Sequence, residues 1–129
     1  MSTFGRRSEE CLESCDKRLD WIAREAIRIV DFSVYCGHRS VAEQDELYVI
    51  GRTKPGRIVT FKRGGESVHN TDPSEAFDFA PYPIDWSDLV RFGYVAGIMK
   101  HIAESGGIPL TWGGHWPRFK DYPHMQIDK

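Results

Sequence analysis

A single acidic residue within an apolar strand constrains this chain more than any other feature. Residues 76–80 alternate as a β-strand does, so Asp78 faces away from Phe77 and Phe79. A carboxylate buried in such a strand needs a cation, several hydrogen-bond donors or a metal ion to offset its loss of water. The fold therefore has to bring compensating groups to Asp78 from elsewhere in the chain.

The other periodic segments predict a mixed set of three helices and four or five short strands. Ser8 is expected to cap the first helix, Ser40 and Glu43 form a capping-box pattern before the second, and Asp85 is expected to cap the third. Helices are predicted over 8–30, 40–51 and 85–106, and strands over 32–36, 58–61, 76–80, 108–112 and 122–127. This order indicates one small α+β domain with antiparallel pairing across 1–129.

Composition and charge exclude several classes of protein. The 129 residues carry a net charge of −2, so no overall basic excess calls for a nucleic-acid or membrane partner. The longest stretch without charged residues, 105–117, is too short for a membrane-spanning helix. No apolar segment of a signal peptide follows Arg6 and Arg7, and the odd number of three cysteines suits a reducing cytoplasm.

Two of the five histidines stand where they could reach Asp78. His69 precedes it by nine residues across a Pro-Ser turn, and His124 lies in a strand-like run in which Met125 and Ile127 point the other way. Two imidazoles and one carboxylate form the ligand set of a catalytic zinc, with the fourth position left for water. The alternative is a hydrogen-bonded Asp78 with two unrelated histidines, and spacing alone does not choose between them.

Four ordered motifs resemble those of the zinc peptidoglycan peptidases. This family groups D-alanyl-D-alanine carboxypeptidases and dipeptidases with phage L-alanyl-D-glutamate endolysins. The matching segments are Gly37-His38-Arg39-Ser40 with Gln44 and Leu47-Tyr48, then 51–56, then 67–78, and finally 112–126. The resemblance covers about residues 8–128 and implies the α+β fold, with an antiparallel sheet and flanking helices, that this family shares with the hedgehog signalling domain.

The resemblance also implies a role for each matching residue. His69, Asp78 and His124 match the ligands of one Zn²⁺ ion, and Asp121 matches the catalytic acid. Arg39 matches an arginine near the substrate's carboxylate or scissile carbonyl. Two further positions are expected to bind substrate: Ser67, and His115, which replaces the family's usual aspartate.

These features lead us to expect a monomeric zinc endopeptidase that acts on the stem peptides of peptidoglycan. A short chain without an export signal or membrane anchor favours a phage endolysin that cleaves the L-alanyl-D-glutamate bond after its release from the host cytoplasm. A D-alanyl-D-alanine carboxypeptidase is the close alternative. A non-catalytic wall-binding or virion structural module is the alternative from another class, and nucleic-acid binding ranks last.

A long glycine-rich loop over 51–66 has three open interpretations. It carries five cationic side chains and one acidic one, Glu66. It is either a solvated loop, a surface that attracts the carboxylates of stem peptides, or a nucleic-acid contact without any recognisable binding module.

Overall fold

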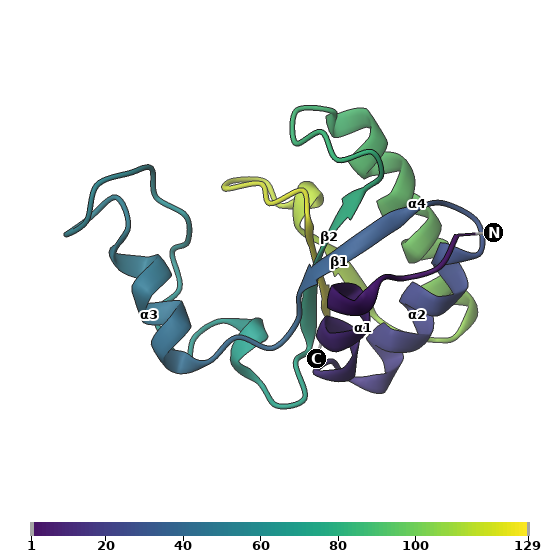
Figure 1. Cartoon of the computed structure of the whole chain (residues 1–129), viewed down its shortest axis with the longest axis horizontal. Coiled ribbons are helices and arrows are strands. Elements are labelled where there is room, and N and C mark those ends of the chain that lie inside the picture. The colour runs from purple at the N-terminus through teal and green to yellow at the C-terminus, as the bar shows by residue number, and fades with distance from the viewer. Residues whose placement is uncertain (1, 129) are drawn as a thin grey trace.

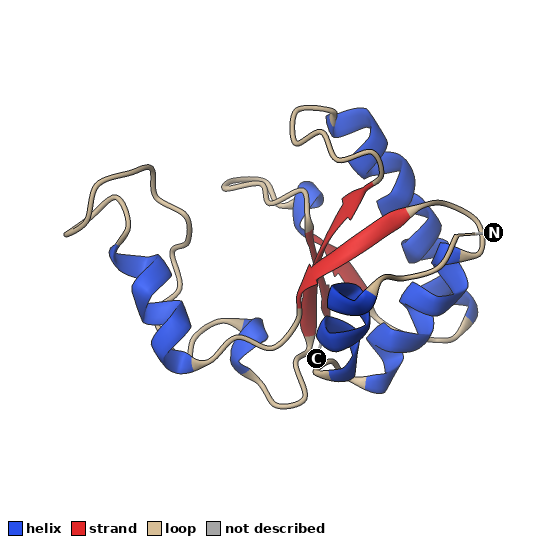
Figure 2. Cartoon of the chain, viewed as in Figure 1, coloured by secondary structure: helices blue, strands red, loops and turns tan. Residues whose placement is uncertain are grey.

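A four-stranded antiparallel sheet organises the computed structural model, which describes residues 2–128 (Figures 1 and 2). The strands lie in the order β1-β2-β4-β3. They are β1 (Phe32–Cys36), β2 (Ala76–Pro81), β3 (Leu110–Trp112) and β4 (His124–Ile127). The α-helices are α1 (Arg6–Glu13), α2 (Lys17–Ile27), α3 (Val41–Val49) and α4 (Leu89–Ser105), with short 3₁₀ helices η1 (Val68–Asn70) and η2 (Gly113–His115). The predicted α+β class with an antiparallel sheet is confirmed.

Three helices cover one face of the sheet and form the core with it. Helix α1 packs on β1, α4 packs on β2 and β3, and α2 packs against α4 (Figure 1). Phe77 and Phe79 of β2 point into this layer and are fully buried. Burial of each such side chain contributes roughly 1.5–3 kcal/mol, so this face supplies most of the stability. None of the helices described for residues 2–128 has the length and apolar character needed to cross a membrane.

Helix α3 and the loop after it lie on the side of the opposite face of the sheet, and they are set apart from the sheet and the other helices (Figure 1). The predicted capping box is confirmed: Glu43 N–H donates to Ser40 Oγ, and the Glu43 carboxylate accepts from Ser40 N–H. The strand predicted over 58–61 is wrong, because this segment takes no regular structure. It is held instead by Gln44, which is fully buried and donates to Thr60 Oγ1 and to the carbonyl of Lys62.

The helix predicted over 8–30 is two helices. The chain breaks between them because Asp16 N–H donates to the carbonyl of Ser74 at 2.8 Å, and the Asp16 side chain caps α2. Ser8 does not cap a helix; it is buried inside α1, and its hydroxyl accepts a hydrogen bond from Val34 N–H. The apolar residues of 8–30 recur as in a single helix because α1 and α2 each bury an apolar stripe against the same core, so the pattern did not reveal the break.

The third predicted helix begins later than expected. Asp88, not Asp85, caps α4 by accepting from Arg91 N–H, while Asp85 accepts from Ser87 within the preceding turn. The remaining predicted strands are confirmed, with ends that shift by a few residues.

Candidate active site

The sheet register places two of the predicted metal ligands next to each other. Asp78 on β2 pairs directly with His124 on β4, and Cys36 on β1 pairs with Asp78 from the other side. His69 comes from η1 and is almost fully buried. Because side chains alternate along each strand, Asp78 lies on the face opposite its two phenylalanine neighbours, where it meets both histidines.

Three atoms of these residues form a nearly regular triangle. His69 Nε2 lies 3.4 Å from Asp78 Oδ1, and His124 Nδ1 lies 3.5 Å from the same oxygen. The two ring nitrogens are 3.2 Å apart. Zinc bonds of 2.0–2.1 Å in tetrahedral geometry place two ligand atoms about 3.3–3.4 Å apart. The observed triangle matches that spacing on all three sides.

The far side of each imidazole fixes which nitrogen faces the triangle. His69 Nδ1–H donates to the carbonyl of Gly37 at 2.8 Å, and His124 Nε2–H donates to Gln126 Oε1 at 2.8 Å. The nitrogen of each ring that faces Asp78 is therefore the one that a metal would bind after it has lost its proton, as in metal-binding histidines whose other N–H is held by a neighbouring acceptor. Gln126 was not predicted to have a role, although its position two residues after His124 places both on the same face of the strand.

The electrostatics of the triangle favour a positive charge at its centre. Burial by itself would raise the pKa of Asp78, but its contacts with His124 and His69 outweigh burial and hold that pKa below its usual range. Burial would lower the pKa of His69, but Asp78 and Cys36 raise it to about 10. Asp78 Oδ1 is buried, and it accepts no hydrogen bond from any of the described residues 2–128. A cation bound by all three atoms would satisfy this oxygen, so these residues fit a divalent metal.

Asp121 lies at the edge of the triangle, on the loop that follows η2. Its Oδ2 is 3.9 Å from His124 Nδ1, and 38% of its side chain is exposed. Burial and the nearby charge of Asp78 raise the pKa of Asp121. Its backbone N–H donates to the carbonyl of Gly113, and a Cβ on Gly113 would lie 2.3 Å from the carbonyl oxygen of Asp121. A glycine at position 113 is therefore required for this placement.

Arg39 reaches the same centre from the start of α3. One of its nitrogens lies 3.7 Å from Asp78 Oδ2 and donates to Cys36 Sγ, while the other donates to Gln44 Oε1 at 2.7 Å. Gln44 thus links Arg39 to the loop after α3, a role that the sequence did not reveal. Only 16% of the Arg39 side chain is exposed, so the guanidinium is held in place beside the triangle.

A cleft of about 770 Å³ opens over these groups. Among residues 2–128, its lining includes Arg39, Ser67 and Asp121 as well as the triangle, with cations and aromatic rings from the surrounding loops. Ser67 also accepts a hydrogen bond from His69 N–H, so it positions that ligand. His115 is exposed, packs edge-on against Trp112 with ring centroids 5.0 Å apart, and does not line the cleft. Substrate binding by His115 stays a prediction that this placement does not support.

Comparisons with known proteins agree with one another. A family model described as phage L-alanyl-D-glutamate peptidase matches residues 1–129. The peptidoglycan L-alanyl-D-glutamate endopeptidase CwlK of Bacillus subtilis (strain 168) is 40% identical over 111 residues, which are 81% of this chain and 65% of CwlK. The crystal structure of the Serratia marcescens L-Ala D-Glu endopeptidase ChiX matches with a TM-score of 0.77 at 30% identity, over 98% of this chain and 90% of ChiX.

Proposed function

Because this chain belongs to the phage L-alanyl-D-glutamate peptidase family, we propose that it hydrolyses the L-alanyl-D-glutamate bond of peptidoglycan with the help of one zinc ion. The single observation that carries the proposal is the triangle of His69 Nε2, Asp78 Oδ1 and His124 Nδ1. Both relatives are named for cleavage of this bond, which favours it over the D-alanyl-D-alanine bond.

The three triangle residues would hold the metal through two neutral imidazoles and one carboxylate. When bound, zinc supplies a Lewis acid that polarises the scissile carbonyl and acidifies a water to a pKa of about 7. The partners on the far side of each ring, Gly37 and Gln126, hold the N–H that does not bind metal, and so orient the other nitrogen of each ring toward the ion.

Asp121 would move the proton. In its carboxylate form it accepts a proton from the attacking water, and it then delivers this proton to the nitrogen of the departing D-glutamate. The second task needs a carboxyl group that holds a proton near neutral pH, and the upward pKa shift of Asp121 serves it. The distance of 3.9 Å to His124 keeps Asp121 beside the metal ligands and outside the triangle.

Arg39 would bind negative charge on the substrate. D-Glutamate in the stem peptide is linked through its side chain, so its α-carboxylate remains free next to the scissile bond. A guanidinium offers a planar pair of donors for such a carboxylate, or for the oxygen of the carbonyl as it gains charge. Its hydrogen bond to the buried Gln44 orients Arg39 before substrate arrives.

We also propose that the chain acts as a phage endolysin, on the basis of the family description, and that it does so as a monomer. CwlK comes from a bacterium, so the same kind of domain also occurs outside phages. Expression inside a bacterium together with a membrane-permeabilising protein should lyse the cells, and the Asp121→Ala variant should leave them intact. Lysis by that variant would contradict the lytic role, and sedimentation as a dimer would contradict the monomer.

The decisive experiment combines metal analysis with digestion of peptidoglycan. The purified protein should contain close to one zinc per chain and release fragments with new amino termini on D-glutamate, detected by mass spectrometry. The Asp78→Asn variant should lose both zinc and activity. The Asp31→Asn variant, a matched change outside the cleft lining, should lose neither. Release of D-alanine instead would establish the carboxypeptidase, and undigested peptidoglycan with zinc present would favour a binding module.

A further inference from the structure

A group of apolar side chains stands exposed between β2 and the first turns of α4. They come from one loop and the adjoining helix, and each is between 43% and 85% exposed: Tyr82, Ile84, Trp86, Leu89, Val90 and Tyr94. Exposed apolar side chains are concentrated in this segment, and large exposed apolar surfaces mark interaction sites. We call this group the aromatic patch.

Trp86 is the fixed centre of the aromatic patch. Its indole stacks on Phe92, with centroids 6.0 Å apart and an interplanar angle of 26°. Phe92 is itself buried and packs against Phe79 of the core, so the stack is anchored. Trp86 is nevertheless 53% exposed, so part of its indole is accessible to a ligand. Aromatic platforms of this kind bind at low entropic cost because few bonds have to be immobilised.

Tyr35 connects the aromatic patch to the catalytic cleft. It lies on β1 and lines the cleft together with Asp78 and Asp121. Its ring meets the indole of Trp86 edge to face, with centroids 5.3 Å apart. Through this contact Trp86, the centre of the aromatic patch, adjoins the lining of the cleft.

The chemistry of the substrate indicates what occupies this continuation. In peptidoglycan the amine of L-alanine is joined to the lactyl group of a muramic acid, so a sugar directly precedes the scissile bond. The residues that follow the bond carry carboxylates. The cleft offers Arg39, Lys62 and Arg118 for negative charge, while Tyr35 leads to the indole of Trp86. Sugar rings present a C–H face that packs on an indole. Asp85 and Ser87, which flank Trp86 in the sequence and hydrogen-bond to each other, carry polar groups of the kind that bind hydroxyls.

We infer that the aromatic patch, centred on Trp86, binds the glycan strand from which the scissile stem peptide hangs. The inference rests on the proposed function, because it takes the cleft to hold the stem peptide. It predicts that the enzyme recognises the sugar as well as the peptide, and so prefers peptides still attached to the wall.

The test compares two substrates that differ only in the sugar. One is the stem peptide with an acetyl group on L-alanine, and the other is the same peptide on the wall disaccharide. The Trp86→Ala variant should lose about threefold to tenfold in kcat/KM on the disaccharide peptide, the size of one aromatic contact, and keep its rate on the acetylated peptide. The Trp86→Phe variant, which can still stack on Phe92, should recover part of the loss.

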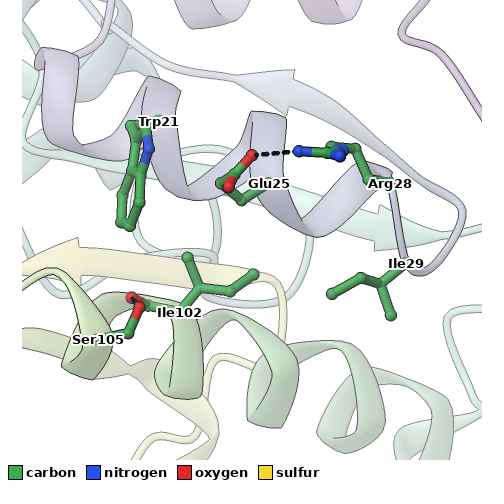
Figure 3. A pocket seen from close by; sticks show the side chains of 6 residues that line it. All are labelled: Trp21, Glu25, Arg28, Ile29, Ile102 and Ser105. Carbon is green, nitrogen blue, oxygen red and sulfur yellow. Dashed lines mark hydrogen bonds and ion pairs between the residues drawn. The ribbon is translucent and has the colours of Figure 1, made fainter.

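A second exposed tryptophan provides the matched control. Trp21 is 40% exposed and lines a shallow depression between α2 and α4, shown in Figure 3 with Glu25, Arg28, Ile29, Ile102 and Ser105. The Trp21→Ala variant should hydrolyse both substrates like the parent protein. Thermal unfolding should confirm that each variant is folded at the assay temperature.

Binding of glycan strands stripped of peptide separates this inference from the proposed function. The parent protein should retain such strands in ultrafiltration, and the Trp86→Ala variant should not. If the parent protein cleaves neither substrate, the proposed function fails, and the retention assay still decides the glycan site. Equal loss of rate by Trp86→Ala on both substrates, or Trp86-dependent self-association without glycan retention, would overturn the inference.

Discussion

The two faces of strand β2 have different roles: one packs in the core and the other carries the candidate active site. On the helix-covered face, Phe77 and Phe79 are fully buried in an apolar core. On the open face, Asp78 meets two histidines and an arginine in a cleft. Neighbouring residues of one strand therefore have different roles, one in the apolar core and the next in the cleft, because side chains alternate with a period of two.

This difference between the two faces predicts which substitutions should lower stability and which should lower activity. The helix face depends on apolar burial that many residues share, so a change there costs stability. The open face depends on a few polar groups at fixed distances, so a change there costs chemistry and leaves most of the core intact. Substitutions on each face can test whether stability and catalysis separate as cleanly as the structure indicates.

The largest effect should come from Asp121→Asn on the open face. Loss of the proton carrier should lower kcat about 10²-fold to 10⁴-fold, because general acid–base catalysis contributes that much. Zinc content and the melting temperature should match those of the parent protein, as measured by metal analysis and thermal unfolding. If zinc is lost together with activity, Asp121 is a metal ligand, and the assignment of three ligands is wrong.

The reverse result is expected for Phe79→Ala on the helix face. Removal of a buried phenylalanine typically costs about 3–5 kcal/mol, which denaturant unfolding measures directly. The fraction that stays folded should bind zinc and hydrolyse peptide at the parent rate per folded molecule. A folded fraction that binds no zinc would show that the two faces are coupled through β2.

A smaller effect should follow from Gln126→Ala, which removes the acceptor for His124 Nε2–H. Loss of such a supporting contact lowers metal affinity about 10-fold to 100-fold, which competition with a chelator measures. The Gln126→Glu variant keeps an acceptor at the same place and should restore affinity. Equal weakening by both variants would show that packing, and not the hydrogen bond, accounts for the effect.

The smallest effect concerns a salt bridge among the helices. Arg24 donates two hydrogen bonds to the Glu9 carboxylate, at 2.6 and 2.7 Å, and this contact lowers the pKa of Glu9. A carboxylate with a lowered pKa stabilises the fold above its unfolded pKa of about 4.3, and this stabilisation is lost as pH falls through the folded pKa. Both side chains are 40% exposed, so the contribution is at most about 1 kcal/mol.

The Glu9→Gln variant tests this pH dependence of the free energy of unfolding. Its free energy of unfolding should lie below that of the parent protein at pH 7, and the difference should shrink toward pH 3. A difference that grows as the pH falls would contradict the assignment. Zinc binding should be the same in both proteins at pH 7, because the salt bridge lies on the helix-covered side.

The sequence predicted those elements that local patterns specify. Alternation located β2, and the reciprocal capping pattern located the start of α3. The break between α1 and α2 was missed because it depends on Ser74, about 60 residues away, which hydrogen-bonds to the chain on both sides of Cys15. The role of Gln44 was missed for the same reason, since it bonds to a loop that shows no periodicity.

The sequence by itself determined which residues are candidates for the metal and for catalysis, because an acid in an apolar strand and the flanking motifs are local features. Only the tertiary structure decided that Asp78 and His124 pair across neighbouring strands and which ring nitrogen each histidine turns toward the carboxylate. It alone joined Trp86 to the cleft through Tyr35. The physical reason is that such convergence depends on strand register and on backbone acceptors far away in the chain, which no local pattern records.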